Sequence, residues 1–336
     1  MRAEALQAPA AAARLLAAEG DRLQALGAAW RAQPPAQLMT VARGSSDHAA
    51  HFFGYLVMAR LGRVVASLPM SVVTLYQSQL QARGLAAVAF SQSGQSPDLV
   101  APMAQVRARG GATVALVNDA ESPLARAAEH VLPLHAGEER SVAATKSFIA
   151  QLVAGAALVA AWQGNAPLQA ALQALPAVLA DAASLDWSAA IHTLANVGGL
   201  YVVGRGTGLP VAMELALKFK EVCGLHAEAF SGAELRHGPM ALVQPGFVVL
   251  VLAPRGPALP GLLALADDLR QRGAQVLLAA PAGVPGADLP LLGAAEADLD
   301  PIALAMAAYP MIEALARERG RDPDQPPHLS KVTRTR

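Results

Sequence analysis

The sequence has few residues that could form crosslinks, metal sites or charged surfaces. Cys223 is the single cysteine among 336 residues, which excludes a disulfide framework and a cysteine-based zinc cluster and favours a reducing compartment. Charged residues make up only 15 %, and the 26 basic and 26 acidic residues give a formal net charge of zero. Binding to nucleic acids or anionic membrane surfaces depends on a basic excess, so we expect neither partner.

Long apolar runs are also missing. The longest apolar stretch with few polar breaks, 148–162, contains Gln151 and falls short of the roughly 18 residues that a membrane span requires. Glu4 and Gln7 stand where a signal peptide needs an unbroken apolar core. Apolar residues nevertheless reach 54 % of the total, many of them alanine. This composition predicts a soluble, cytoplasmic protein with a large core.

Short apolar runs bounded by glycine, serine or proline alternate with amphipathic stretches. The runs at 38–42, 86–90 and 113–117 predict buried strands. The stretches that follow Asp47, Pro97 and Val142 predict helices. Strand, helix and strand in succession predict an α/β fold, in which helices cover both faces of a parallel sheet.

The second half of the sequence repeats the first at an offset of 162 positions. Residues 41–45 match 203–207, and two further strand ends match at the same offset. Three matches in order predict two similar doubly wound lobes. We expect an N-terminal helical segment at 1–29, lobes at 30–165 and 190–318, a helical linker at 166–189, and a tail at 319–336.

Polar side chains follow the predicted strand at 86–90. They are Ser91, Gln92, Ser93 and Ser96. Hydroxyls, an amide and the free N–H groups at a helix start form a neutral site for a dianion such as phosphate. Ser45 and Ser46, at the end of the preceding strand, supply further donors. A serine-rich turn that only caps the next helix is the alternative, but four polar residues directly after a buried strand favour the anion site.

The helix predicted from 209 to about 223 carries three charged residues on one face. Glu214, Lys218 and Glu221 are spaced by four and three residues, which is also typical of a solvated salt-bridge stripe. This chain is sparing with charge, however, and the stripe leads toward His237 in a turn. A carboxylate, an ammonium and an imidazole together are what proton transfer beside a carbonyl needs.

The tail offers a candidate amine nucleophile. Pro326 and Pro327 stiffen the segment that precedes Lys331. A lysine held in an apolar cleft forms a Schiff base more readily than an exposed one. The alternative is a frayed tail without a function.

These motifs, taken in order, resemble the sugar isomerase (SIS) family over nearly the whole chain, and closely the isomerase module of glucosamine-6-phosphate synthase. The matching segments are 1–9, 43–46, 91–94, 142–146, 204–206, 216–221, 226–229, 234–239, and 324–326 with Lys331. The resemblance implies tandem SIS domains in a homodimer with a shared active site. It implies a phosphosugar substrate and neither a metal ion nor an organic cofactor.

The resemblance also implies a role for each candidate residue. Ser91, Gln92, Ser93 and Ser96 would bind the sugar phosphate, and Ser46, with Ser45 beside it, and the backbone at Val142 would complete the pocket. Glu221 would move the proton between C1 and C2, with Lys218 near the oxygens of these carbons and Glu214 as an orienting partner. His237 of the other subunit would open the sugar ring. Lys331 would form an imine with the ketose.

The departures from the family pattern favour one reaction. The synthase's glutaminase uses a cysteine directly after the initiator methionine, whereas position 2 is Arg2 here. The loop at 94–98 looks like that of stand-alone deaminases. We therefore expect conversion of glucosamine 6-phosphate to fructose 6-phosphate and ammonium, by ring opening, proton transfer and imine hydrolysis, without glutaminase activity. A deglycase of fructosyl-amino-acid 6-phosphates and a non-catalytic phosphosugar sensor are the alternatives.

Overall fold

The computed structural model describes residues 1–331, which fall into two compact units. The N-terminal unit consists of Ala10–Glu139, Lys146–Gln173 and the described part of the tail from Ser330. The C-terminal unit consists of Met1–Pro9, Arg140–Thr145 and Ala174–Leu329. Each unit is therefore assembled from three separate stretches of chain. The lobe boundaries expected from the sequence stay predictions.

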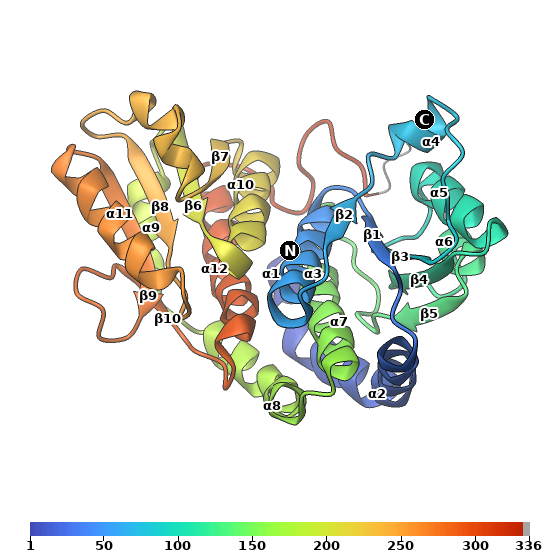
Figure 1. Ribbon diagram of the computed structural model, residues 1–336. Helices are drawn as coiled ribbons and strands as arrows, with labels where there is room; N and C mark the ends of the chain where they lie inside the picture. Colours follow the sequence, from blue (N-terminus) through green and yellow to red (C-terminus); the bar gives the residue numbers. More distant parts are fainter. Residues whose placement is uncertain (332–336) are drawn as a thin grey trace. The chain divides into compact units, whose positions relative to one another are not determined.

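A five-stranded parallel sheet forms the centre of the N-terminal unit, in the order β2–β1–β3–β4–β5 (Figure 1). The strands are β1 (Gln37–Val41), β2 (Val65–Ser67), β3 (Leu85–Ser91), β4 (Ala112–Val117) and β5 (His130–Pro133). The strands predicted at 38–42, 86–90 and 113–117 are β1, β3 and β4. All of β3 is buried, as expected for a central strand with both faces covered.

Helices cover the two faces of this sheet. They are α2 (Ala8–Ala32), α3 (Ser45–Leu61), α4 (Ser71–Thr74), α5 (Pro97–Ala108), α6 (Pro123–Ala127) and α7 (Lys146–Gln163). Side chains alternate between the faces of a strand. On β3, Ala87 and Ala89 pack with Met103 of α5, whereas Phe90 contacts Phe53 of α3. Helices α3 and α7 lie side by side, and α7 is buried along nearly all of its length (Figure 1).

The C-terminal unit contains a second parallel sheet, in the order β10–β9–β8–β6–β7. Its strands are β6 (Gly199–Gly204), β7 (His226–Ser231), β8 (Val248–Leu252), β9 (Gln275–Pro281) and β10 (Leu289–Leu291). Its longer helices are α10 (Leu209–Cys223), α11 (Leu259–Gln271) and α12 (Asp300–Glu318), with α1 (Arg2–Ala5) and α9 (Ser188–Leu194) packed on α12. Helix α8 (Ala166–Ala182) leads from one unit into the other.

The two sheets have the same topology. When the strands are counted from the first of each unit, both orders read 2–1–3–4–5. The expectation of two similar doubly wound lobes is confirmed. The strand order reverses between β1 and β3, and again between β6 and β8. In open α/β sheets such switch points are where ligands bind, at the carboxyl ends of the strands.

One described helical stretch, Ala297–Glu318, is long and apolar enough to cross a membrane by length and composition alone. Within the protein, however, 89 % of its apolar window is buried. It includes α12, which packs against α10. The stretch is therefore accounted for as a core helix.

Cys223 ends α10 with a fully buried side chain, and its thiol donates to the carbonyl oxygen of Ile312 at 3.4 Å. Burial raises the pKa of the Cys223 thiol to about 12.

The buried thiol should react slowly, because the thiolate is the reactive form. In mildly alkaline buffer the folded protein should react with Ellman's reagent about a hundredfold more slowly than the protein unfolded in guanidinium chloride. Absorbance measures both rates, and equal rates would contradict this burial.

Candidate active-site residues in the two units

Two loops converge at the switch point of the N-terminal unit. Strands β1 and β3 are parallel neighbours, so the loops that follow them lie at the same edge of the sheet. Gly44, at a left-handed φ of 55°, turns the chain from β1 into α3. Gly94, at φ 62°, lies in the loop after β3, where a Cβ atom would come within 2.2 Å of the Ser122 Oγ. The start of α3 and the start of α5 are thus brought to one place.

Ser91, the last residue of β3, and Ser93, in the loop that follows, each have a fixed hydrogen-bond direction. The Oγ of Ser91 accepts the N–H of Gly94 at 2.9 Å, and the Oγ of Ser93 accepts the N–H of Gln95 at 3.3 Å. A hydroxyl carries one proton, and an oxygen that already accepts a bond has that proton left to donate. Both serines can therefore donate to an anion in the loop.

Ser46, on α3, also accepts a hydrogen bond and has its own proton left to donate. Its Oγ accepts a hydrogen bond from the side-chain Nε2 of Gln151 at 3.0 Å. Ser45 begins α3, half-buried, and Gln92 is half-buried in the facing loop. These hydroxyl and amide groups sit at the switch point, where the sequence analysis predicted an anion site.

Ser96 occupies the N-cap position of α5, with Pro97 in the first turn. Its side chain nevertheless makes no capping hydrogen bond, and its Oγ is buried without a partner among residues 1–331. A serine that served only as a cap would satisfy a backbone N–H of α5. The geometry therefore disfavours the interpretation of Ser96 as a cap alone.

A buried carboxylate lies in the first turn of α5. Asp98 is 2 % exposed and pairs with Arg43 at 2.7 Å, from Asp98 Oδ2 to Arg43 Nη2. Arg43 precedes Gly44, so the ion pair joins the two loops. It also offsets a negative charge that would otherwise repel an anion bound nearby.

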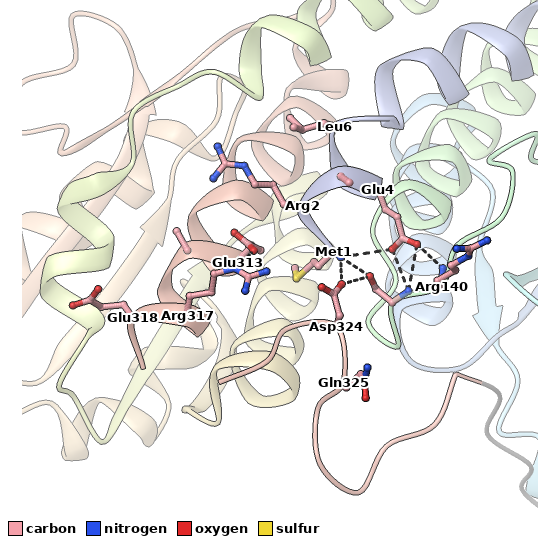
Figure 2. A pocket seen from close by; sticks show the side chains of 13 residues that line it. Met1, Arg2, Glu4, Leu6, Arg140, Glu313, Arg317, Glu318, Asp324 and Gln325 are labelled. Atoms are coloured by element: carbon pink, nitrogen blue, oxygen red, sulfur yellow. Dashed lines mark hydrogen bonds and ion pairs between the residues drawn. The ribbon is translucent and has the colours of Figure 1, made fainter. Parts of the chain in front are cut away.

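The segment that contains Val142 belongs to the C-terminal unit. The N–H of Val142 donates to the carbonyl oxygen of Asp324 at 3.4 Å, so a ligand contact at the Val142 backbone would use its carbonyl group. The hydroxyl of Ser141 donates to the Asp324 carboxylate at 2.6 Å. Glu4 accepts the N–H groups of Arg140 and Ser141 (Figure 2).

A cavity of about 1010 Å³ lies beside this segment. Figure 2 shows the side chains that line it. Acidic and basic side chains line it together, among them Glu313, Arg317 and Asp324. The amino group of Met1 and the Ser141 hydroxyl lower the pKa of Asp324. None of the predicted catalytic or phosphate-binding residues lines this cavity. We therefore do not assign the chemistry to it.

The charged face of α10 is buried and not solvated. Lys218 is 1 % exposed; its Nζ lies 3.4 Å from Glu214 Oε1 and 2.5 Å from Glu221 Oε2. Glu214 is fully buried and also accepts the hydroxyl of Tyr309 at 3.4 Å. Burial alone would lower the pKa of Lys218, but the two carboxylates outweigh it and raise the pKa above its usual value. Lys218 is therefore a fixed ammonium group, and the solvated-stripe interpretation is wrong.

Glu221 is the one member of this cluster that reaches a cavity. Its side chain is 21 % exposed and lines a cavity of about 410 Å³, within the size range of small-molecule sites. Lys220 and Arg321 also line it, as do residues 327–329 of the tail. A carboxylate that is held by a buried ammonium and faces a cavity is placed to exchange a proton with a ligand.

His237 lies in an exposed turn. It follows the short 3₁₀ helix η2 (Glu234–Arg236), and Gly238 comes next with φ 137°. Its ring makes no hydrogen bond within residues 1–331, and it does not line the cavity beside Glu221. The shared site in a homodimer stays a prediction.

Lys331 is held by an ion pair within the N-terminal unit. Its Nζ lies 3.0 Å from Oε2 of Glu139, whose side chain is fully buried. Glu139 also accepts the hydroxyl of Ser147 at 2.6 Å and the N–H of the same residue at 3.2 Å. The tail is thus attached at Lys331 and not frayed there.

Among residues 1–331, no group of three or more His, Cys, Asp or Glu side chains is arranged to hold a metal ion.

Two contacts were missed by the sequence analysis. Gln151 and Glu139 support Ser46 and Lys331 from positions 105 and 192 residues away along the chain. The contact of Gln151 could have been suspected from the sequence, because Gln151 is a lone amide in a long apolar stretch and a buried amide needs a hydrogen-bond partner. Glu139 had no comparable signal in the sequence.

The substitution Lys218→Met tests the buried cluster. It would leave Glu214 as an uncompensated buried charge, so we expect the free energy of unfolding to fall by about 3–5 kcal/mol. Urea denaturation measures this loss. The double variant Glu214→Gln/Lys218→Met should recover part of it, because it removes the stranded charge.

Arg272 provides a matched control. It pairs with Asp268 at the same i, i+4 spacing, at 3.0 Å, but its side chain is 52 % exposed. Arg272→Met should cost less than about 1 kcal/mol. Equal losses for the lysine and arginine variants would contradict the importance of burial.

Comparison with known proteins gives a consistent result. The sequence model described as "SIS domain" matches residues 33–161 and 193–280. Glutamine–fructose-6-phosphate aminotransferase (isomerizing) of Aeropyrum pernix is 34 % identical over 319 residues, which cover 88 % of this chain and 51 % of that protein. The same enzyme of Methanothermobacter thermautotrophicus is also 34 % identical, with 87 % and 50 % covered. The chain spans about half the length of these curated relatives.

Solved structures share the fold over most of the chain. A candidate phosphosugar isomerase from Silicibacter pomeroyi has a TM-score of 0.91 and 42 % identity, with 96 % of this chain and 99 % of that one covered. The C-terminal domain of glucosamine-fructose-6-phosphate aminotransferase from Francisella tularensis has a TM-score of 0.85 and 24 % identity, with 96 % and 97 % covered. Glucosamine-6-phosphate deaminase from Thermotoga maritima has a TM-score of 0.73 and 22 % identity, with 97 % and 100 % covered, which shows the fold alone. The duplicated sheet and these matches together show that the chain belongs to the SIS domain family.

Proposed function

We propose that this chain is a phosphosugar isomerase of the SIS family that deaminates glucosamine 6-phosphate. The reaction consumes one water and gives fructose 6-phosphate and ammonia, which is protonated in solution. The proposal rests on the position of Glu221. Its carboxylate is ion-paired with the buried Lys218 and lines a cavity of about 410 Å³. Such a group is needed to carry a proton between adjacent carbons.

The switch-point loops of the N-terminal unit are suited to the phosphate group. Ser46, Ser91 and Ser93 each accept a bond from the protein and have a proton to donate. Ser96 adds a buried hydroxyl that no described residue engages. Donors at the starts of two helices, supported by the helix dipoles, favour a doubly charged ester.

Glu221 and Lys218 have different roles at C1 and C2: Glu221 transfers the proton, and Lys218 stabilises the charge that develops. Glu221 takes the proton from C2 of the open-chain sugar and returns it to C1. The amine at C2 also loses one N–H proton and the aldehyde oxygen at C1 takes up one, so that C2 becomes an imine and C1 a hydroxymethyl group. The oxygen at C1 gains negative charge during this transfer. The fixed ammonium of Lys218 stabilises that charge without having to reorganise.

Lys331 completes the release of ammonia. Its amine adds to C2 and displaces ammonia, which leaves an imine between C2 and Lys331. Water then hydrolyses this imine to the ketose and the free amine. Because Lys331 is ion-paired with Glu139 in the structure, its ammonium must lose a proton before it adds. The proposal requires both residue sets to serve one substrate, as the family resemblance implies.

The single thiol of these residues is not a candidate nucleophile. Cys223 is fully buried, and burial raises its pKa to about 12. These 336 residues therefore contain no reactive thiol that would hydrolyse glutamine.

The purified protein should release ammonium from glucosamine 6-phosphate, and glutamine should not change the rate. Glu221→Gln should lower kcat about a hundredfold or more, because it removes the acid–base group, while binding of the phosphosugar is retained. A coupled ammonium assay and calorimetric titration measure the two effects. Glu129→Gln, on the exposed surface of the N-terminal unit, is the matched control and should change neither.

Several outcomes would redirect the proposal. Ammonium release from no hexosamine phosphate, together with release of amino acid from a fructosyl-amino-acid 6-phosphate, would favour the deglycase. Full activity of Glu221→Gln would contradict the assigned role of the carboxylate. Phosphosugar binding without turnover of any substrate would favour a sensor.

His237 and Glu221 allow a test of the shared site. Glu221→Gln and His237→Ala should each be nearly inactive alone. If each site takes His237 from the other subunit of a dimer, half of the randomly mixed dimers contain one intact site. Unfolding and refolding an equal mixture should then restore about a quarter of the wild-type activity. No recovery, with dimers present by light scattering, would contradict sharing.

A further inference from the structure

Gln151 is an unusual residue in its surroundings. It lies on α7, where its neighbours Ala150 and Leu152 are fully buried and apolar, and it is itself 1 % exposed. A buried amide is unfavourable unless its polar atoms are hydrogen-bonded. Packing alone would favour an apolar side chain at this position, so the amide calls for another explanation.

The two polar atoms of Gln151 have different environments. Its Nε2 donates to the Oγ of Ser46 at 3.0 Å. Its Oε1 is buried and has no hydrogen-bond partner among residues 1–331. The donor half of the amide is thus engaged at the start of α3, in the predicted phosphate site, while the acceptor half is left open.

The contact fixes the direction of the hydrogen bond at Ser46. An amide NH₂ group donates and does not accept. The Ser46 oxygen is therefore the acceptor in this pair, and its own proton is directed away from Gln151. Ser91 and Ser93 are polarised in the same way by backbone N–H groups. At Ser46 the protein uses a side chain from another helix to achieve this.

We infer that Gln151 is a positioning residue that makes Ser46 a hydrogen-bond donor to the phosphorylated ligand. The inference rests on the proposed function and names a residue that contacts the ligand only through Ser46. The side chain of residue 151 therefore matters for its hydrogen-bonding polarity and not for its volume.

Two near-isosteric variants separate polarity from volume. Gln151→Glu, in its ionised form, would present only acceptor oxygens, so the Ser46 proton would turn toward residue 151 and away from the ligand. Gln151→Met would keep an apolar side chain of similar length and leave the Ser46 proton undirected. We expect Kd and KM for glucosamine 6-phosphate to rise about tenfold for the Met variant and more for the Glu variant. We expect kcat to change less than about twofold, since Glu221 is untouched.

A double-mutant cycle shows whether Gln151 acts through Ser46. Ser46→Ala should weaken binding, and Ser46→Ala/Gln151→Met should weaken it no further, because the group that Gln151 orients is already gone. Additive losses would overturn the inference. Each variant is made in the Glu221→Gln background, where the probe glucosamine 6-phosphate is bound but not turned over, so that calorimetry measures each Kd; thermal melting confirms that each variant is folded.

Gln163→Met is the matched control on the same helix. Gln163 ends α7, and its Nε2 donates to the carbonyl oxygen of Arg60 at the far end of α3, at 3.1 Å. The same change of side chain there should leave Kd at its wild-type value. Wild-type binding with unchanged Kd in Gln151→Met would overturn the role of Gln151 and leave the proposed function standing. No binding by the wild-type protein to any hexose phosphate would overturn both.

Discussion

An ammonium group in the interior of the C-terminal unit determines what its neighbours must be. Lys218 is almost completely buried, and a lone cation there would be far less stable than in water. Glu214 and Glu221 compensate it from the same helix, and Glu214, itself fully buried, depends on Lys218 in turn. Because the three charges require one another, their geometry is fixed by the fold. Glu221 is consequently held in place at the cavity before any ligand arrives, and the chemistry proposed for it needs no rearrangement of α10.

The duplicated fold places two different kinds of chemistry at equivalent positions. Helix α3 follows the first strand of one sheet, and α10 follows the first strand of the other, at the offset of the sequence repeat. The start of α3 presents neutral hydroxyls, which are suited to a ligand that brings its own charge. The body of α10 carries an ammonium and two carboxylates, which are suited to moving protons. The same arrangement of strand and helix thus carries neutral hydrogen-bond donors in one copy and a buried charged cluster in the other.

The sequence predicted the parts of the structure that depend on local pattern. Strands β1, β3 and β4, the limits of α10 and the place of Ser96 at the start of α5 follow from periodicity and from helix-start preferences. The spacing of Glu214, Lys218 and Glu221 gave their common face but not their burial, which depends on the packing of α12 and Tyr309 over α10. The partners of Ser46 and Lys331 lie more than a hundred residues away in sequence. Such contacts are set by tertiary packing, and no local pattern encodes them.

The interleaved composition of the two units has a consequence for how the chain is made. Helix α1 and residues 140–145 belong with α12, whereas Lys331 belongs with Glu139 and α7. A ribosome delivers these segments in sequence order, so the early ones emerge long before their partners. Neither unit attains its full set of contacts until the tail has left the exit tunnel. Contacts between residues so distant in sequence also slow folding. In a nascent chain α1 therefore lacks its contacts with α12, and Glu139 lacks its ion pair with Lys331, until residues 300–331 have emerged.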